Sequence, residues 1–340
     1  MYPKFPLPLL VSSAKCFRSC VPVRAFQHLS RSSLRIPTRR YASVAAPQCH
    51  SSQSSDSPTV HSFFEENTST WQYVVLDPAT REAALIDTVL DYDPSSGTIS
   101  TTSADRILSF IETHGLKIKY VLETHAHADH LTAAQYYKKK IQVPVGIGRR
   151  ISTVQETFAP IYGFSPSSFV DTFDLLFRDD EEFSLGNLSC RVIHLPGHTP
   201  DHVGYVIGQT VFTGDSIFMP DCGSARSDFP GGDAKALYSS MQRLMALPES
   251  FRLFVGHDYP IGRDQLCMST VGHQTDSNKH GGKGISESEF IAFRNARDAV
   301  LGTPHLLHPS LQTNIRGGRL PRDTMGRLAF KIPIITSVEL

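Results

Sequence analysis

The 340-residue sequence contains no apolar run near the roughly 18 residues that a membrane-spanning helix requires. It also has no net charge, because 33 lysines and arginines balance 33 aspartates and glutamates. The excess of basic side chains that binds nucleic acids or anionic membrane surfaces is therefore absent. A hydrophobic content of 40% and a charged content of 19% are those of an ordinary globular protein. We expect a folded protein with neither a nucleic-acid nor a membrane partner.

Cysteine is scarce, and its spacing excludes two classes of structure. The six cysteines are Cys16, Cys20 and Cys49 near the start, and Cys190, Cys222 and Cys267 in the rest of the chain. No two of them form a CxxC pair, which argues against structural zinc bound by sulfur. Three sparse cysteines in the main part of the chain also do not make a disulfide framework.

Acidic residues are missing from the start of the chain. None precedes Asp56, whereas that stretch carries eight lysines and arginines and many serines. An Arg- and Ser-rich leader without acidic residues is typical of a mitochondrial transit peptide, and the alternative is a basic tail that carries no targeting signal. We predict a transit peptide over residues 1–45, import into the mitochondrial matrix, and a polar linker over 46–57. A core would then span residues 58–260, with a C-terminal helical extension over 261–340 that completes the domain.

The rest of the sequence alternates short apolar runs with amphipathic segments. Residues 63–77 and 83–87 read as the two arms of a β-hairpin, and Ser286 with Glu289 forms a capping-box pattern before a helix. Strands are expected at 118–124, 143–148, 188–197, 202–208, 210–218 and 251–259, and helices at 103–115, 131–140, 233–247 and 285–300. Two halves of this kind, each rich in strands and helices, predict a layered α/β sandwich.

The motif THAHADH, residues 124–130, places three imidazoles and one carboxylate directly after a buried strand. His125 and His127 are two residues apart, so on an extended segment they point to the same side. Asp129 and His130 follow where the chain turns, and can face a second position nearby. Burying these four groups without a partner would be costly, and their spacing has no other evident purpose. The motif therefore predicts a metal site.

Three more candidate ligands follow glycines at the ends of later strands. His198 follows Pro196-Gly197, Asp215 follows Gly214, and His257 follows Gly256. Strand-terminal loops meet at one edge of a sheet, so these groups can join the THAHADH segment in one site. We interpret His194 and His202 as ordinary histidines, although His202 is close enough to support a ligand.

These motifs together resemble the metallo-β-lactamase superfamily over residues 60–260. The order is the same: Asp87 in LID, then HxHxDH, His198 in GHT, Asp215 in TGD and His257 in GHDY. The resemblance implies an αββα four-layer sandwich. It also implies one metal site of His125, His127 and His198, a second of Asp129, His130 and His257, and a bridging Asp215.

Residues 214–259 and 284–321 resemble more narrowly the persulfide dioxygenases, or sulfur dioxygenases, of the glyoxalase II branch. That resemblance implies one Fe²⁺ per chain, held by His125, His198 and Asp215 as catalytic residues, which suits O₂ chemistry. The substrates would be glutathione persulfide and O₂ and the products sulfite and glutathione, in mitochondrial sulfide detoxification. His127, Asp129, His130 and His257 would orient the ligands or hold a second metal ion.

The same resemblance places three residues at the substrate. Arg226 and Asp228 match the RxDF positions of these enzymes, and Tyr259 follows the GHD motif. Arg226 suits a carboxylate of glutathione, and the alternative is a structural ion pair.

Two other functions fit the same ligands. The first is a hydroxyacylglutathione hydrolase of the glyoxalase II kind, in which a Zn²⁺ pair, or two iron ions, would cleave a glutathione thioester. The segment after Asp215 argues against it, because that segment resembles the dioxygenases. The second is a non-catalytic metal-binding or scaffold protein, against which stands the retention of every ligand. A homodimer is one of the assemblies that the resemblance allows.

Overall fold

A computed structural model describes residues 46–52 and 54–334 of the chain. The predicted transit peptide, residues 1–45, lies outside the described residues. The segment that we expected to be a linker, residues 46–57, is instead partly structured: β1 (Gln48–His50) pairs antiparallel with β2 (Thr59–Glu65). β2 buries Val60, Ser62, Phe63 and Glu65, and β1 extends the sheet beyond it.

The first sheet has seven strands in the order β1-β2-β3-β4-β7-β9-β10. Its remaining strands are β3 (Thr70–Leu76), β4 (Glu82–Ile86), β7 (Lys117–Leu122), β9 (Val145–Gly148) and β10 (Leu175–Phe177). Pairing is antiparallel from β1 to β4 and parallel from β4 to β10. The carboxyl ends of β4, β7, β9 and β10 therefore share one edge.

The second sheet has six strands in the order of the sequence. They are β11 (Glu182–Leu185), β12 (Leu188–His194), β13 (Val203–Ile207), β14 (Thr210–Gly214), β15 (Arg252–Val255) and β16 (Met268–Thr270). β14 and β15 are parallel, and the other neighbours are antiparallel. A small third sheet joins β5 (Val89–Asp93), β6 (Thr98–Ser100) and β8 (Leu131–Thr132).

The two large sheets pack face to face around a core of aromatic and aliphatic side chains. Trp71 and Tyr73 of the first sheet meet Tyr205, Phe212 and Phe254 of the second, and each of these five is at most 2% exposed. The Tyr73 ring lies 5.2 Å from Phe212 and 5.5 Å from Phe254, with tilted and edge-on geometry. Removing this apolar surface from water is the main force that holds the sheets together.

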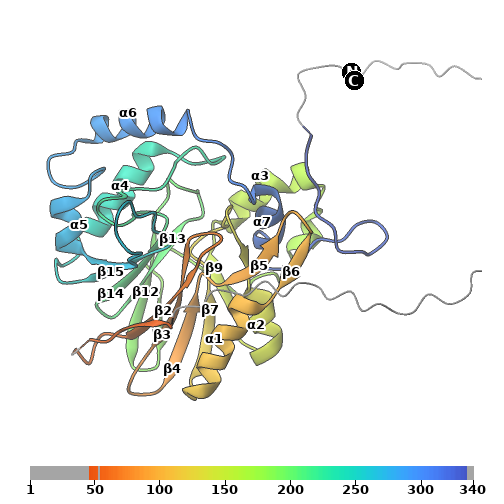
Figure 1. The fold of residues 1–340 in the computed structure, drawn as a ribbon, viewed down its shortest axis with the longest axis horizontal. Coiled ribbons are helices and arrows are strands. Elements are labelled where there is room, and N and C mark those ends of the chain that lie inside the picture. Colours follow the sequence, from red (N-terminus) through yellow and green to blue (C-terminus); the bar gives the residue numbers. More distant parts are fainter. Residues whose placement is uncertain (1–45, 53, 335–340) are drawn as a thin grey trace, which may run out of the picture. The chain divides into compact units, whose positions relative to one another are not determined.

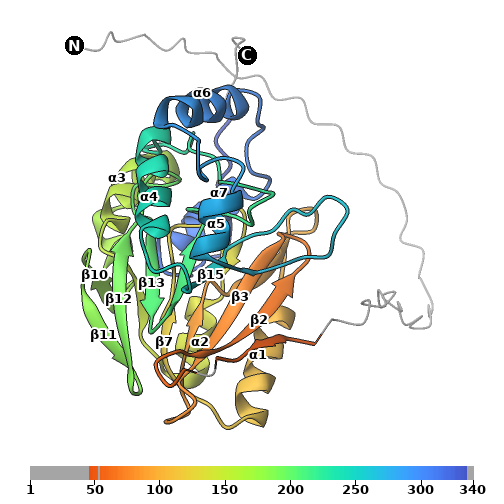
Figure 2. The ribbon, with the colours of Figure 1, turned by 90° about the vertical axis from the view of Figure 1, so that its left-hand side faces the viewer.

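Helices cover the outer face of each sheet, as Figures 1 and 2 show. On the first sheet, α1 (Thr102–Thr113) and α2 (Ala134–Ile141) bury Ile107 and Tyr137. On the second sheet, α4 (Ala234–Met245), α5 (Val271–Ser277) and α6 (Glu287–Asp298) bury Leu237, Val271 and Phe290. Near the predicted site lie α3 (Ile151–Tyr162), the 3-10 turn η1 (Pro166–Phe169) and α7 (Leu307–Asn314). The predicted αββα sandwich is confirmed.

Most predicted elements form, with two corrections. Residues 63–77 are not one arm of a hairpin, because a turn at 66–69 divides them between β2 and β3. The predicted helix at 131–140 begins only at Ala134, since Leu131 and Thr132 form β8. The capping box of Ser286 and Glu289 is confirmed at the start of α6. Within the described residues, no helix has the length and apolarity needed to cross a bilayer.

Candidate metal centre

The seven predicted ligands come from loops at one edge of the sandwich. β7 leads into residues 125–130 at the shared carboxyl edge of the first sheet. In the second sheet β13 is antiparallel to both β12 and β14, so β12, β14 and β15 all end at the same side. His198, Asp215 and His257 follow these three strands. The strand directions thus explain why residues 132 positions apart in the chain meet.

Two glycines make room for the close packing of side chains and backbone at this edge. A Cβ atom on Gly256 would stand 2.5 Å from Asp215 Oδ1. Gly214 has φ +47°, and a Cβ there would stand 2.5 Å from Thr124 Oγ1. Only glycine leaves room for the Asp215 carboxylate at the first position and adopts the backbone of the second without strain.

The first half-site consists of His125, His198 and Asp215. One ligand atom from each lies within 4.8 Å of the other two, and all three residues are buried. His198 Nε2 faces Asp215 Oδ2 at 3.6 Å. Two imidazoles and one carboxylate arranged in this way can bind a divalent transition metal.

The second half-site consists of Asp129, His130 and His257. His257 Nε2 lies 3.2 Å from Asp129 Oδ2 and 3.5 Å from Asp215 Oδ1. Asp215 therefore presents Oδ2 to the first half-site and Oδ1 to the second. The His127 ring lies between the halves, 4.2 Å from the rings of both His125 and His130.

The hydrogen-bond pattern fits a metal at this place. Thirteen buried side-chain atoms have no hydrogen-bond partner among the described residues, and four of them belong to predicted ligands: His125 Nε2, His127 Nδ1, His130 Nε2 and Asp215 Oδ1. An unpaired buried polar atom is costly because it forfeits its interaction with water. These four lie in one cluster of predicted ligands, so bound cations would satisfy them together. The residues present fit one or two metal ions.

Two buried carboxylates hold His127 from its far side. His127 Nε2 lies 3.1 Å from Asp87 Oδ1 and 3.2 Å from Glu123 Oε2. Burial opposes charge on His127, but Asp87 and Glu123 outweigh it and raise its pKa well above the usual value. Burial raises the pKa of Glu123 despite its hydrogen bonds. A carboxylate behind a ligating histidine fixes the ring orientation and leaves Nδ1 facing the site. Sequence reasoning missed Glu123, whose only signal was its position at the end of the strand.

The other histidines are fixed mainly by backbone groups. The Nδ1 atom of His198 donates to the carbonyl oxygen of Arg226 at 2.8 Å, and that of His257 donates to Ser69 O at 3.0 Å. His125 Nδ1 lies 3.0 Å from Thr124 Oγ1. In each case Nε2 is left free to face the site.

His202 has a larger role than our interpretation gave it. The backbone N–H of Asp215 donates to His202 Nε2 at 2.9 Å, and the His202 ring stacks on His125 at 4.7 Å. Burial and nearby histidines lower the pKa of His202 well below its usual value, so its Nε2 stays an acceptor. His194 lies outside this cluster and donates to Pro200 O at 3.0 Å, as expected for an ordinary histidine.

Charge in the two half-sites favours cation binding. Burial alone would raise the pKa of Asp129, but His257 and His130 lower it far below its usual range. Burial and neighbouring histidines lower the pKa of His125 well below its usual value. Asp129 and His125 are thus in the protonation states that metals require, whereas a cation must displace the proton that the neighbouring carboxylates favour on His127 and His257 by raising their pKa values.

Arg226 and Asp228, two of the predicted substrate residues, bind each other. Arg226 Nε and Nη2 donate to the Asp228 carboxylate at 2.5 and 2.6 Å, and Nη1 donates to Gly302 O at 2.8 Å. The ion pair that we weighed as the alternative is therefore present. Contact of either side chain with substrate stays a prediction.

Tyr259, the third predicted substrate residue, lies beside His257. Its side chain is 51% exposed, and its ring stacks on His257 with centroids 5.9 Å apart. Desolvation of the hydroxyl, together with the charges of Asp129 and Asp215, raises the pKa of Tyr259 well above its usual value. The phenol thus stays protonated, and its ring lies against a ligand of the second half-site.

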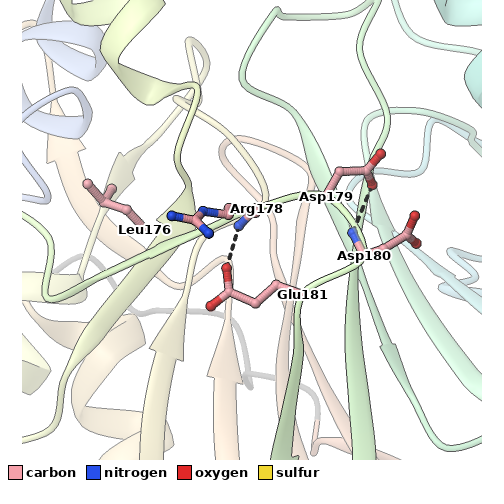
Figure 3. Close-up of a pocket in the computed structure, with 5 residues that line it drawn as sticks. All are labelled: Leu176, Arg178, Asp179, Asp180 and Glu181. Atoms are coloured by element: carbon pink, nitrogen blue, oxygen red, sulfur yellow. Dashed lines mark hydrogen bonds between the residues drawn. The ribbon is translucent and has the colours of Figure 1, made fainter.

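A separate groove of about 540 Å³ lies where the chain crosses between the sheets. Figure 3 shows its lining residues, Leu176, Arg178, Asp179, Asp180 and Glu181. Asp179 and Asp180 are paired with Arg243 at 2.9 and 3.0 Å. None of the seven predicted ligands lines this groove, so it is distinct from the metal centre.

Comparison with known proteins shows the family to which the chain belongs. A family model described as the metallo-beta-lactamase superfamily matches residues 67–257. The beta-lactamase hydrolase-like protein of Xylella fastidiosa (strain 9a5c) is 47% identical over 83% of this chain, which spans 66% of that relative. Glyoxylase B2 of Dictyostelium discoideum is 42% identical over 82% of this chain and 98% of its own length.

At lower sequence identity, the chain is also similar to persulfide dioxygenases. The human protein named persulfide dioxygenase ETHE1, mitochondrial, is 30% identical over 75% of this chain and 87% of its own. The crystal structure of ETHE1 from Myxococcus xanthus superposes with a TM-score of 0.62 at 30% identity, covering 76% of this chain and 99% of that one. Hydrolase-type names thus accompany the higher identities.

Proposed function

Because the chain belongs to the metallo-beta-lactamase superfamily, we propose that it is a metal-dependent hydrolase that cleaves a thioester of glutathione. The observation that carries this proposal is the position of Asp215, with one carboxylate oxygen toward His198 and the other toward His257. A carboxylate placed in this way would contribute to both half-sites if each of them held a metal ion. Binuclear centres of this kind suit hydrolysis.

When bound, a metal pair would supply Lewis acidity toward the thioester carbonyl and the attacking water. The histidines of the two half-sites, with Asp129 and Asp215, would hold the pair. The two carboxylates would neutralise only part of the charge of two divalent ions, and the remaining positive charge would stabilise a developing oxyanion. Tyr259 can donate a hydrogen bond to substrate from the rim of the second half-site. His127, held by the carboxylates of Asp87 and Glu123, lies between the two half-sites and fixes their positions relative to each other.

The names of the relatives support the hydrolytic class. They include a beta-lactamase hydrolase-like protein, and the name glyoxylase B2 points to the glyoxalase system. Glutathione is also the thiol that both functions suggested by the sequence motifs share. S-lactoylglutathione, a thioester of glutathione, serves as the test substrate.

A second candidate function is the persulfide dioxygenase that the sequence motifs predict. It is favoured by the first half-site, where His125, His198 and Asp215 form the two-histidine, one-carboxylate set of many Fe²⁺ enzymes. Similarity to human persulfide dioxygenase and to the Myxococcus structure supports it further. Here a single Fe²⁺ would bind glutathione persulfide and O₂, and the second half-site would only orient ligands.

One experiment separates the two functions. The purified full chain is assayed for metal content, for hydrolysis of S-lactoylglutathione, and for O₂ uptake with glutathione persulfide. The variants His257→Gln and His198→Gln each disable one half-site. The hydrolase predicts two metal ions per chain and loss of thioester cleavage in both variants. One iron per chain, with O₂ uptake that survives His257→Gln, would replace the hydrolase with the dioxygenase.

We also propose that the protein works in the mitochondrial matrix, since residues 1–45 have the composition of a transit peptide. A fluorescent protein fused after residue 45 should enter mitochondria. A variant of this fusion in which the arginines of residues 1–45 are changed to glutamine should stay outside them.

A homodimer is the assembly that we propose for the mature protein. Light scattering of the purified protein would show a single chain mass if that proposal is wrong.

A further inference from the structure

The peptide group between Arg226 and Ser227 connects the metal centre to α6. Its carbonyl oxygen, on Arg226, accepts the Nδ1–H of His198 at 2.8 Å. Its N–H, on Ser227, donates to Asp298 Oδ2 at 2.8 Å. In a planar trans peptide the C=O and N–H point in opposite directions, so His198 and Asp298 lie on opposite sides of one rigid unit.

We propose that Asp298 is a positioning residue for His198 that acts through this peptide group, and the proposal rests on His198 being a metal ligand in the function given above. A charged acceptor at the N–H polarises the peptide and makes its carbonyl a stronger acceptor. The stronger bond to Nδ1–H fixes the His198 ring and makes Nε2 a better donor to a metal. A carboxylate in direct contact with a ligating histidine has the same effect, and here one peptide group relays it.

The surrounding contacts hold both neighbours of the peptide. Asp298 Oδ2 also accepts the hydroxyl of Ser227 at 3.1 Å. Arg294, one helical turn before Asp298, pairs with its Oδ1 at 2.6 Å and donates to Ala225 O at 3.0 Å. The backbone is therefore clamped on each side of the carbonyl that His198 uses. α6 lies beside α4 (Figures 1 and 2), and its Arg294 and Asp298 side chains contact the loop at residues 225–227.

Burial separates this arrangement from an ordinary surface ion pair. Arg294 is 3% exposed and Asp298 is 6% exposed. Removing two charges from water is costly, and an apolar pair of similar size often stabilises a fold as well or better. Fold stability is therefore a weak reason for this pair. Control of a ligand's geometry is a reason that the contacts support.

The test uses full-length protein loaded with Co²⁺, whose visible spectrum reports ligand geometry. Asp298→Asn keeps the size of the side chain but removes its charge. We expect it to weaken binding of the ion in the first half-site by about 10- to 100-fold and to change that ion's spectrum. The ion in the second half-site should be unaffected. Glu287→Gln, on the exposed side of α6 in an ion pair with Lys235, is the matched control and should match wild type.

The double variant Arg294→Met/Asp298→Leu covers the case in which Asp298→Asn does not fold. It replaces the ion pair by packed apolar groups, so its melting temperature should stay near wild type while Co²⁺ affinity falls. Wild-type affinity and spectrum in that folded variant would overturn the proposal. Arg294→Lys keeps a positive charge beside Asp298 and should retain most of the affinity.

A measurement without metal keeps this proposal separate from the proposed function. In the metal-free protein, NMR should detect the His198 Nδ1–H as a slowly exchanging ring proton, and Asp298→Asn should speed its exchange. Unchanged exchange would refute the relay through the peptide group. If the wild-type protein neither cleaves the thioester nor takes up O₂, the proposed function is refuted, and the relay from Asp298 to His198 is not affected by that result.

Discussion

Replacing Gly256 by alanine should disable the metal centre with little damage to the rest of the fold. The new Cβ would lie 2.5 Å from Asp215 Oδ1, and 3.2 and 3.3 Å from the carbonyl carbon and oxygen of Gly214. An ordinary contact begins near 3.4 Å. The Asp215 carboxylate must therefore retreat by about 1 Å, because the Gly214 backbone is fixed by the pairing of β14 with β15.

The expected magnitude follows from that displacement. A misplacement of about 1 Å in a reacting group can cost about 100-fold in rate. Overpacking of one methyl group usually costs about 1–3 kcal/mol of stability. Gly256→Ala should therefore lose one or both metal ions and about 100-fold in kcat/KM, yet unfold cooperatively at a modestly lower temperature.

The matched control is Gly272→Ala in α5. There the nearest atom to a new Cβ is Glu249 Cβ at 3.4 Å, an ordinary contact. Alanine also favours a helix over glycine by up to about 1 kcal/mol. Gly272→Ala should keep full activity and equal or greater stability. The reasoning is refuted if Gly256→Ala binds metal and cleaves substrate within twofold of wild type.

Three further predictions concern the site's support and the stability of the chain. Glu123→Gln should lower metal affinity about 10- to 100-fold, measured by competition with a chelating dye, because it removes one carboxylate behind His127. Chelation of the metal should lower the melting temperature, since a ligand present at 100 times its Kd stabilises the fold by about 2.7 kcal/mol, and an unchanged melting curve would contradict bound metal. Burial alone would raise the pKa of Asp174, but hydrogen bonds from Lys138 and the Val145 backbone lower it overall. The stability that this carboxylate contributes is therefore present above its unfolded pKa and is lost as pH falls through its lower folded pKa. Melting curves below about pH 4 should show a smaller loss in Lys138→Met than in wild type.

Elements with a strong local pattern were predictable. The amphipathic spacing around Ile107 places α1 almost where the sequence predicts it, and Ser286 with Glu289 marks the start of α6. These signals act over one or two turns of chain, so no knowledge of distant contacts is needed. Residues 131–132 escaped prediction because their strand exists only through pairing with β5, more than 30 residues earlier.

The candidate site also contains residues that the sequence predicts and residues whose part it does not reveal. The seven candidate ligands were predictable because THAHADH places three imidazoles and a carboxylate within six positions, and because the later GHT, TGD and GHDY motifs resemble the metallo-β-lactamase pattern. Asp298 carries no such signal, since an aspartate near the end of a helix is usually solvated. Its role depends on a peptide group 71 residues away in the sequence. The role of Arg226 also changed, because its guanidinium is bound by Asp228 while its carbonyl oxygen reaches His198.

Short-range patterns of apolar residues and glycines were enough to predict a layered α/β sandwich, and the order of the ligand motifs was enough to suggest its αββα form through their resemblance to a known family. How the candidate ligands face one another was visible only in the folded structure. The two oxygens of Asp215 point into different half-sites, His202 lies behind that carboxylate, and α6 reaches His198 through one peptide group. The physical reason is that orientation depends on the packing of strands and helices distant in the chain, and no local pattern encodes that packing.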